Sequence, residues 1–143
     1  MPITEINIEA VLKAAEVVPA DSPVVMLNLV RYNEHADYGG RTDLPACSGQ
    51  EAYLQRYAPA FDAVAAAEGI TGIQVLYLGG VAAALAAPDG ERWDTIVLVQ
   101  YPSFAAFRAI TESPKYMADA LLHRKAALAD WRLIATSQVP LPG

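Results

Sequence analysis

Tyr116, His123 and Arg124 are the residues of this chain whose types and spacing best fit chemistry. Arg124 interrupts the apolar row of the helix expected after Pro114, and Tyr116 lies one heptad before His123, so their side chains project from similar sides. An arginine there would bind a carboxylate or carbonyl group, and a histidine would act as acid or base near neutral pH. The pattern predicts one wall of a pocket, with His123 and Arg124 as candidate catalytic residues and Tyr116 as a substrate-binding candidate.

A structural role explains the same residues. Cations near the C-terminal end of a helix complement its dipole. Arg124 can also pair with Asp130 or Asp94 and bury its aliphatic stem. Because structural ion pairs perturb pKa values as functional sites do, we favour the structural explanation and keep the functional one as a hypothesis.

Three more substrate-binding candidates lie in or beside the strand expected at Val24–Val30. Asn28 is the polar residue in the otherwise apolar run VVMLNLV, so its amide either satisfies backbone groups or faces a cavity. Arg31 and Tyr32 follow at the end of the strand. They either shape the mouth of a cavity or mark a solvated entry into a loop.

The polar segment Asn33–Ser48 predicts a loop. Glu34, His35 and Asp37 within it suggest a metal site, but the segment matches no established metal motif, and the second histidine, His123, is distant in sequence. We therefore expect no metal. The loop is either a lid over a cavity or a variable surface loop.

Length and charge narrow the class of protein. A chain of 143 residues is long enough for one domain with a sizeable core. Its formal net charge of −6 and its lack of a basic run argue against a nucleic-acid partner.

Cys47 stands alone, so no intramolecular disulfide is expected. The uncharged run Ile70–Pro88 contains glycines and polar residues and ends in a turn, so we expect no membrane span. Early acidic residues argue against a secretory signal, and we expect a cytoplasmic protein.

Hydrophobic periodicity, caps and turns predict eight elements. The expected helices are Asn7–Val18, Ser48 to about Glu68 with a kink or restart at Pro59, Phe104–Ile110, and Pro114 to about Leu128. The expected strands are Val24–Val30, Ile73–Ala87 with a bulge at Gly79-Gly80, Thr95–Tyr101 and Arg132–Gln138. The predicted N-caps are Ser48, Ser103 and Ser113. On the helix from Ser48, an apolar and mainly aromatic stripe, called the aromatic stripe, consists of Tyr53, Tyr57, Phe61 and Val64.

The order of these elements is a helix followed by β-α-β-β-α-β, which is the ferredoxin-like α+β arrangement with an antiparallel sheet. We expect an N-terminal helical extension over residues 1–22, the ferredoxin-like domain over 23–139 and a tail over 140–143. The strands are apolar on both faces, whereas a sheet with one wet face alternates. Because the helices cover one face, the pattern predicts a homodimer of sheets packed face to face. The N-terminal helix folding over part of the open face is a compatible alternative.

The runs GERWDTIVLVQYPSFAAF, ESPKY and HRKAALADWRLIATS, in that order, resemble the bacterial family called domain of unknown function thirteen-thirty. That family lies in the dimeric α/β-barrel superfamily. VVMLNLVRYNEHADY and SGQEAYLQRY are similar to the front end of one subgroup, so the resemblance covers nearly the whole chain after Asp21. It implies a ferredoxin-like protomer, a homodimer and an unassigned function. Trp131 departs from the pattern, which has a small residue there, and a bulky aromatic would reshape a nearby cavity.

We therefore expect an uncharacterised homodimer with a small organic acid or aromatic molecule bound in a cavity between sheet and helices. If the protein is an enzyme, the superfamily implies cofactor-independent isomerase or monooxygenase-like chemistry. Asn28 would then orient a carbonyl, Arg124 would bind charge and His123 would move a proton. A non-catalytic assembly or binding module is the other alternative. Haem binding, with His123 as axial ligand, follows from superfamily analogy alone, and we expect no cofactor.

Overall fold

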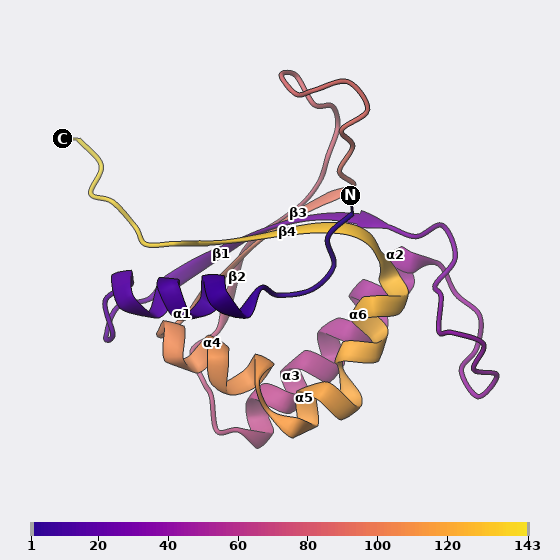
Figure 1. The fold of residues 1–143 in the computed structure, drawn as a ribbon, viewed down its shortest axis with the longest axis horizontal. Helices are drawn as coiled ribbons and strands as arrows, with labels where there is room; N and C mark the ends of the chain where they lie inside the picture. Colours follow the sequence, from indigo (N-terminus) through magenta and orange to yellow (C-terminus); the bar gives the residue numbers. More distant parts are fainter. Residues whose placement is uncertain (1, 143) are drawn as a thin grey trace.

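The computed structural model describes residues 2–142 and shows a four-stranded antiparallel sheet with its helices on one face (Figure 1). The strands lie in the order β2-β3-β1-β4. Their bounds are β1 Val24–Tyr32, β2 Gln74–Gly80, β3 Thr95–Tyr101 and β4 Leu128–Thr136. This arrangement confirms the α+β, ferredoxin-like βαββαβ topology predicted from the sequence.

The helices form a layer beneath the sheet (Figure 1). Their bounds are α1 Ile8–Val17, α2 Gly49–Glu51, the π-helix η1 Ala52–Tyr57, α3 Ala58–Ala67, α4 Phe104–Thr111, α5 Pro114–Asp119 and α6 Leu121–Ala127. The three predicted serine caps are confirmed: the hydroxyl oxygens of Ser48, Ser103 and Ser113 each accept a backbone N–H of the first helical turn. The helix does not restart at Pro59: Tyr57 and Ala58 keep helical dihedral angles, and the hydrogen-bonding pattern changes there from the π-helix η1 to α3.

The second strand is shorter than the sequence suggested. It ends at Gly80, opposite Thr95, and residues 81–94 leave the sheet as an arm that rises away from the helices (Figure 1). The register shift falls between Val75 and Tyr77 rather than at the glycine pair. The ring of Tyr77 instead lies over Gly79, where a Cβ would come within 2.4 Å of it.

The C-terminal half also differs from the prediction. The single helix expected up to Leu128 is interrupted at Ala120, which separates α5 from α6. The last strand begins at Leu128 rather than Arg132, because the backbone pairs with β1 as soon as α6 ends. Early pairing buries Leu128 and Trp131 in a cluster with Val30.

The sheet has one covered face and one open face. Alternate residues of β1, Val24, Met26, Asn28 and Val30, are buried against the helices, and the residues between them are only partly buried. Helix α1 lies on the covered side, where Val11 and Ala14 pack against the core cluster (Figure 1). The idea that the N-terminal helix covers the open face is therefore wrong. Its apolar side chains instead follow the core edge beside β4 and α4.

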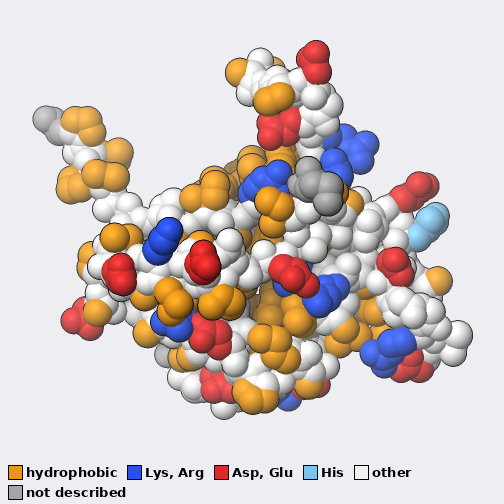
Figure 2. Space-filling model, viewed as in Figure 1, with side chains coloured by type: hydrophobic (Ala, Val, Ile, Leu, Met, Phe, Trp, Pro, Cys, Tyr) orange, Lys and Arg blue, Asp and Glu red, His pale blue; other side chains and the backbone are white. Residues whose placement is uncertain are grey.

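The arm and the C-terminal tail carry hydrophobic side chains that stand clear of the body (Figure 2). Leu85 at the arm is 96% exposed, and Leu141 in the tail is 87% exposed. The base of the arm is held by backbone hydrogen bonds from Val81 N–H to the carbonyl of Asp94 and from Asp94 N–H to the carbonyl of Val30.

Gly49 marks the closest approach of three segments. A Cβ there would lie 2.2 Å from the carbonyl oxygen of Asn33 and 2.6 Å from that of Ala127. We expect Gly49→Ala to lower the free energy of unfolding by about 1–3 kcal/mol, because backbone atoms must move apart. Urea denaturation measures this, with Gly80→Ala as the control, since a Cβ at Gly80 meets open space. Equal midpoints for the two variants would contradict the close approach.

Candidate functional site

A cavity lies between the covered face of the sheet and the η1–α3 helix. Its volume is about 170 Å³, and its lining residues include Asn28, Tyr53, Tyr57, Phe61, Val97 and Tyr101. We call it the tyrosine cavity. Strands β1 and β3 supply its floor and the aromatic stripe of the helix supplies its roof, so the cavity lies where the sequence predicted one.

The aromatic side chains around this cavity form a continuous packed cluster. Tyr53 and Tyr57 stack with ring centroids 5.4 Å apart, and Phe61 lies 6.0 Å from Tyr57. The hydroxyls of Tyr57 and Tyr116 are 2.9 Å apart and share a hydrogen bond. The predicted helical stripe is confirmed, and its packing fixes the position of each ring.

Two tyrosine hydroxyls of the cavity have no hydrogen-bond partner among residues 2–142. They belong to Tyr53 and Tyr101, and burial raises the pKa of both phenols well above the usual value. Both groups are therefore neutral at physiological pH and able to donate or accept. Neither hydroxyl is among the fully buried polar atoms that lack a partner, so both remain accessible from the cavity.

Asn28 lines the tyrosine cavity, but its amide is already engaged. Its Nδ2 donates to the carbonyl oxygen of Val97 at 3.3 Å and to that of Met26 at 3.5 Å. Its Oδ1 accepts the indole N–H of Trp131 at 3.1 Å. Asn28 thus ties β1 to β3 and β4, and it offers a ligand only the second lone pair of its oxygen.

Arg31 and Tyr32 go to different places. Tyr32 turns to the covered face after the bulge, donates its hydroxyl to Thr95 Oγ1 at 2.9 Å and packs 5.8 Å from the ring of Tyr53. The pKa of Tyr32 is raised, and burial is the largest cause. Arg31 pairs in register with Asp130 and does not line the tyrosine cavity.

Arg124 is 3% exposed, and none of the described carboxylates pairs with it. Its Nη1 donates to the carbonyl oxygen of Thr4, and its guanidinium lies 4.4 Å from the ring centroid of Trp131. Asp94 instead accepts the backbone N–H of Tyr32. The ion pair that a structural role predicted is therefore not formed within the described chain.

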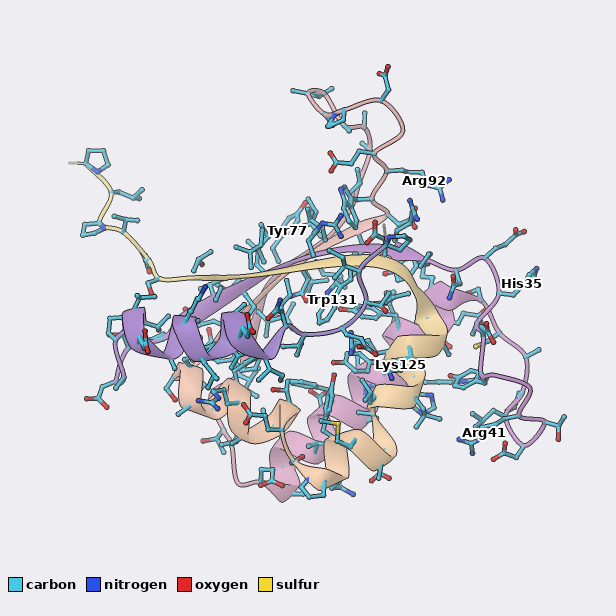
Figure 3. The ribbon with its side chains drawn as sticks, in the orientation of Figure 1. His35, Arg41, Tyr77, Arg92, Lys125 and Trp131 are labelled. Atoms are coloured by element: carbon cyan, nitrogen blue, oxygen red, sulfur yellow. The ribbon has the colours of Figure 1, made fainter. Side chains whose placement is uncertain are left out.

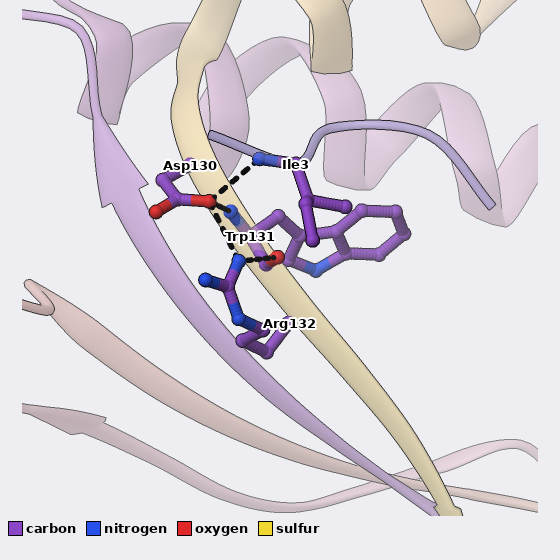
Figure 4. Close-up of polar contacts among 4 residues, drawn as sticks. All are labelled: Ile3, Asp130, Trp131 and Arg132. Atoms are coloured by element: carbon purple, nitrogen blue, oxygen red, sulfur yellow. Dashed lines mark hydrogen bonds and ion pairs between the residues drawn. The ribbon is translucent and has the colours of Figure 1, made fainter. Parts of the chain in front are cut away.

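Asp130 is committed to a different cluster (Figure 4). It accepts the backbone N–H groups of Ile3 and Trp131, both at 2.8 Å, and the guanidinium of Arg132 at 2.7 Å. Burial acts to raise the pKa of Asp130, but these hydrogen bonds together hold it below the usual value. Asp130 therefore stays ionised and fastens the N-terminal segment to β4.

His123 faces the Asn33–Ser48 loop rather than a cavity. Its Nδ1 lies 2.8 Å from the hydroxyl of Tyr38, and the two rings meet edge to face. Arg56 lies over the other side of the Tyr38 ring and donates to the carbonyl of Pro45 at 2.6 Å. The loop is thus docked on η1 and α6 and does not cover the tyrosine cavity. His35, by contrast, points into solvent (Figure 3).

Apart from Arg31 and Tyr32, the candidate residues divide among three places. Asn28 lines the tyrosine cavity, Arg124 and Tyr116 line a second cavity beneath the N-terminal segment, and His123 holds the loop. The structure does not bring Asn28, Arg124 and His123 to one reacting centre. The tyrosine pair that marks the first cavity was not among the predicted site residues, although the aromatic stripe had indicated its roof.

Within the described residues, no group of three histidine, cysteine or acidic side chains is placed to hold a metal ion. No described helix combines the length and apolar character needed to cross a membrane.

The topology and the helical layer define a ferredoxin-like α+β protein with small cavities beneath the covered face of its sheet. A family model described as "Domain of unknown function (DUF1330)" matches residues 47–137, and the chain belongs to this family. The resemblance inferred from the sequence is thereby confirmed. No curated protein matches the chain.

Two solved structures of one protein are similar over the whole chain. RPA0582 of Rhodopseudomonas palustris, described as a protein of unknown function, is 29% identical with a TM-score of 0.81, covering 99% of this chain and 100% of that chain. Methylated RPA0582 is 30% identical with a TM-score of 0.79, covering 97% and 96%. A Thermobifida fusca protein described as dimeric, ferredoxin-like and of unknown function is 21% identical with a TM-score of 0.46, covering 81% and 91%.

The Tyr38–His123 contact makes loop docking sensitive to pH. Burial, then the positive charges of Arg56 and Arg41, hold the pKa of His123 below its usual value. When folding lowers the pKa of a histidine, its contribution to the free energy of unfolding is lost as pH falls below the unfolded pKa of about 6.5. We expect Tyr38→Phe to cost about 0.5–1.5 kcal/mol at pH 7.5, where neutral His123 accepts the hydroxyl proton. We expect a smaller cost at pH 5, closer to the lowered pKa, because protonation of Nδ1 removes the lone pair that accepts the hydroxyl proton.

Urea denaturation of wild type and Tyr38→Phe at both pH values measures the difference. Thr71→Ala is the control, because it removes an exposed hydroxyl in a loop far from Tyr38 in sequence. A cost that is the same at both pH values would show that His123 does not titrate against Tyr38.

Proposed function

We propose that this protein is a homodimeric binding protein whose tyrosine cavity takes a small, single-ring aromatic molecule. The observation that carries the proposal is the pair of cavity hydroxyls, on Tyr53 and Tyr101, that have no partner within residues 2–142. Apolar and aromatic walls with a few convergent polar groups are typical of small-molecule sites.

The size of the cavity supports a ligand of one ring. Its volume is about 170 Å³, close to the roughly 150 Å³ of an engineered apolar cavity that binds benzene. The faces of the surrounding tyrosines offer stacking and edge-to-face contacts to a ring. A hydroxyl or carbonyl substituent on that ring would pair with the two tyrosine hydroxyls.

Filling the cavity should abolish binding without unfolding the protein. Ala58 lies on α3 and lines the cavity, so Ala58→Leu places a larger side chain in the ligand's space. We expect the affinity for phenol, measured by calorimetric titration, to fall at least about tenfold, since a displaced ring loses its van der Waals contacts. Ala63→Leu is the matched control, because Ala63 is exposed on the same helix.

The substituent can be tested separately. Tyr101→Phe removes a hydroxyl at nearly constant volume, so phenol should bind more weakly while benzene binds unchanged. If phenol binds equally well to wild type, Ala58→Leu and Ala63→Leu, it binds elsewhere and the tyrosine cavity is not its site.

The homodimer is proposed from the open face. One row of paired residues runs across all four strands on that face: Tyr77, Leu98, Leu27 and Ile134. The outer members Tyr77 and Ile134 are 55% and 48% exposed. The neighbouring row is Gln74, Gln100, Val25 and Thr136, which is more polar. An apolar centre beside a polar rim is the anatomy of a protein–protein interface, and a second copy supplies a matching surface.

A charge at the centre of that row should separate the protomers. We expect Leu27→Glu to raise the dimer dissociation constant by roughly a hundredfold or more, because the carboxylate would be buried unpaired between two sheets. Light scattering after size-exclusion chromatography reports the mass, and circular dichroism confirms folding. Leu12→Glu is the control, as Leu12 is 52% exposed on α1, on the covered side. A monomeric wild type, or an unchanged Leu27→Glu dimer, would refute this interface.

A further inference from the structure

We infer that a second cavity, between the N-terminal segment and helices α4–α6, binds the carboxylate group of a small organic acid through Arg124. This cavity has a volume of about 190 Å³. Its walls come from residues before and within α1 on one side and from the helical layer on the other. It is separate from the tyrosine cavity, so this inference does not depend on the proposed aromatic ligand.

Arg124 is the feature that points to a ligand. It lines the cavity although it is 3% exposed, and its Nε is buried with no hydrogen-bond partner among residues 2–142. A buried cation is costly unless it is paired and fully hydrogen-bonded. The carbonyl of Thr4 satisfies Nη1 alone, so the described chain leaves most of this requirement unmet.

The other charges around the cavity are already balanced. Glu5 pairs with Lys125 at 3.4 Å, and Glu112 pairs with Arg108 at 2.6 Å. All three of Glu5, Glu112 and Lys125 line the cavity with Arg124. The charge without a counter-ion in this part of the described structure is therefore that of Arg124, and an anion would complete the balance.

The geometry of the guanidinium favours a carboxylate. Trp131 covers one face of the group at 4.4 Å, and Nη1 is used by Thr4. The edge that carries Nε and Nη2 makes no hydrogen bond to a described residue. Two parallel N–H donors on one edge match the two oxygens of a carboxylate. A lysine ammonium does not offer this paired arrangement of donors.

The size and remaining walls define the rest of the ligand. A volume of 190 Å³ corresponds to roughly six water molecules at their share of liquid volume. The apolar lining includes Ile6, Val11 and Leu121. A short aliphatic acid of about that many non-hydrogen atoms, such as propionate or butyrate, fits both the volume and the apolar walls.

The test uses sodium propionate as the probe and propionamide as its neutral isostere, at constant ionic strength set with sodium chloride. We expect propionate, and not propionamide, to raise the melting temperature of the wild type. Nitrogen-edited NMR should show the Arg124 Nε–H resonance moving in the same titration. Arg124→Lys should weaken propionate binding about tenfold or more, because the paired donors are lost. Lys115→Gln, which alters an exposed pair with Asp119, should leave binding unchanged.

Three results would overturn the inference: no propionate effect on the wild type, an equal effect of propionamide, or full binding by Arg124→Lys. Preferential binding of inorganic phosphate over propionate would overturn the carboxylate assignment. If Arg124→Lys does not fold, the wild-type Nε–H titration decides, since only a ligand at the guanidinium moves that resonance while propionamide does not.

Discussion

The hydrogen bond from the indole of Trp131 to Asn28 is the contact on which both cavities depend. It joins β4 to β1 beneath the covered face, and both residues are nearly fully buried. On one side Asn28 forms part of the floor of the tyrosine cavity. On the other, the face of the Trp131 ring supports the guanidinium of Arg124. Loss of this bond would leave an indole N–H and an amide oxygen unpaired in the core, at a cost of about 1–3 kcal/mol each.

Trp131 therefore does more than fill space. A small side chain there would bring neither the N–H that Asn28 accepts nor the aromatic face beneath Arg124. Asn28 would then have a vacant oxygen aimed at the interior, and Arg124 would lose its cation–π contact. The bulky Trp131 and the buried Arg124 therefore form one unit, because the indole ring covers one face of the guanidinium.

The local signals of the sequence were sufficient for the fold and insufficient for the site. Ser48, Ser103 and Ser113 were recognisable as caps, since a hydroxyl that accepts an N–H acts within one turn. The alternate burial of β1 residues was not recognisable, because both faces of VVMLNLV are apolar and only the packing of the helices decides which face is covered. The end of β2 at Gly80 was not recognisable, because strand length depends on where the partner strand begins.

The grouping of Tyr116, His123 and Arg124 was harder for a geometric reason. The heptad argument assumed one helix, but Ala120 interrupts it, so Tyr116 and His123 lie on different helices. Adjacent residues on a helix also project about 100° apart, which sends His123 outward to Tyr38 while Arg124 turns inward to Trp131. Tyr116 and Arg124 still share a cavity, because both face the N-terminal segment.

The N-terminal segment links these observations energetically. Its backbone is fastened at two successive residues: Ile3 donates to Asp130, and Thr4 accepts from Arg124. The same segment supplies one wall of the Arg124 cavity, and α1 has no fully buried residue of its own. One of the contacts that fix its position is thus made by the arginine whose charge lacks a carboxylate partner within residues 2–142. An anion bound there would be linked to the order of the N-terminal segment, since the anion and the carbonyl of Thr4 bind the same guanidinium.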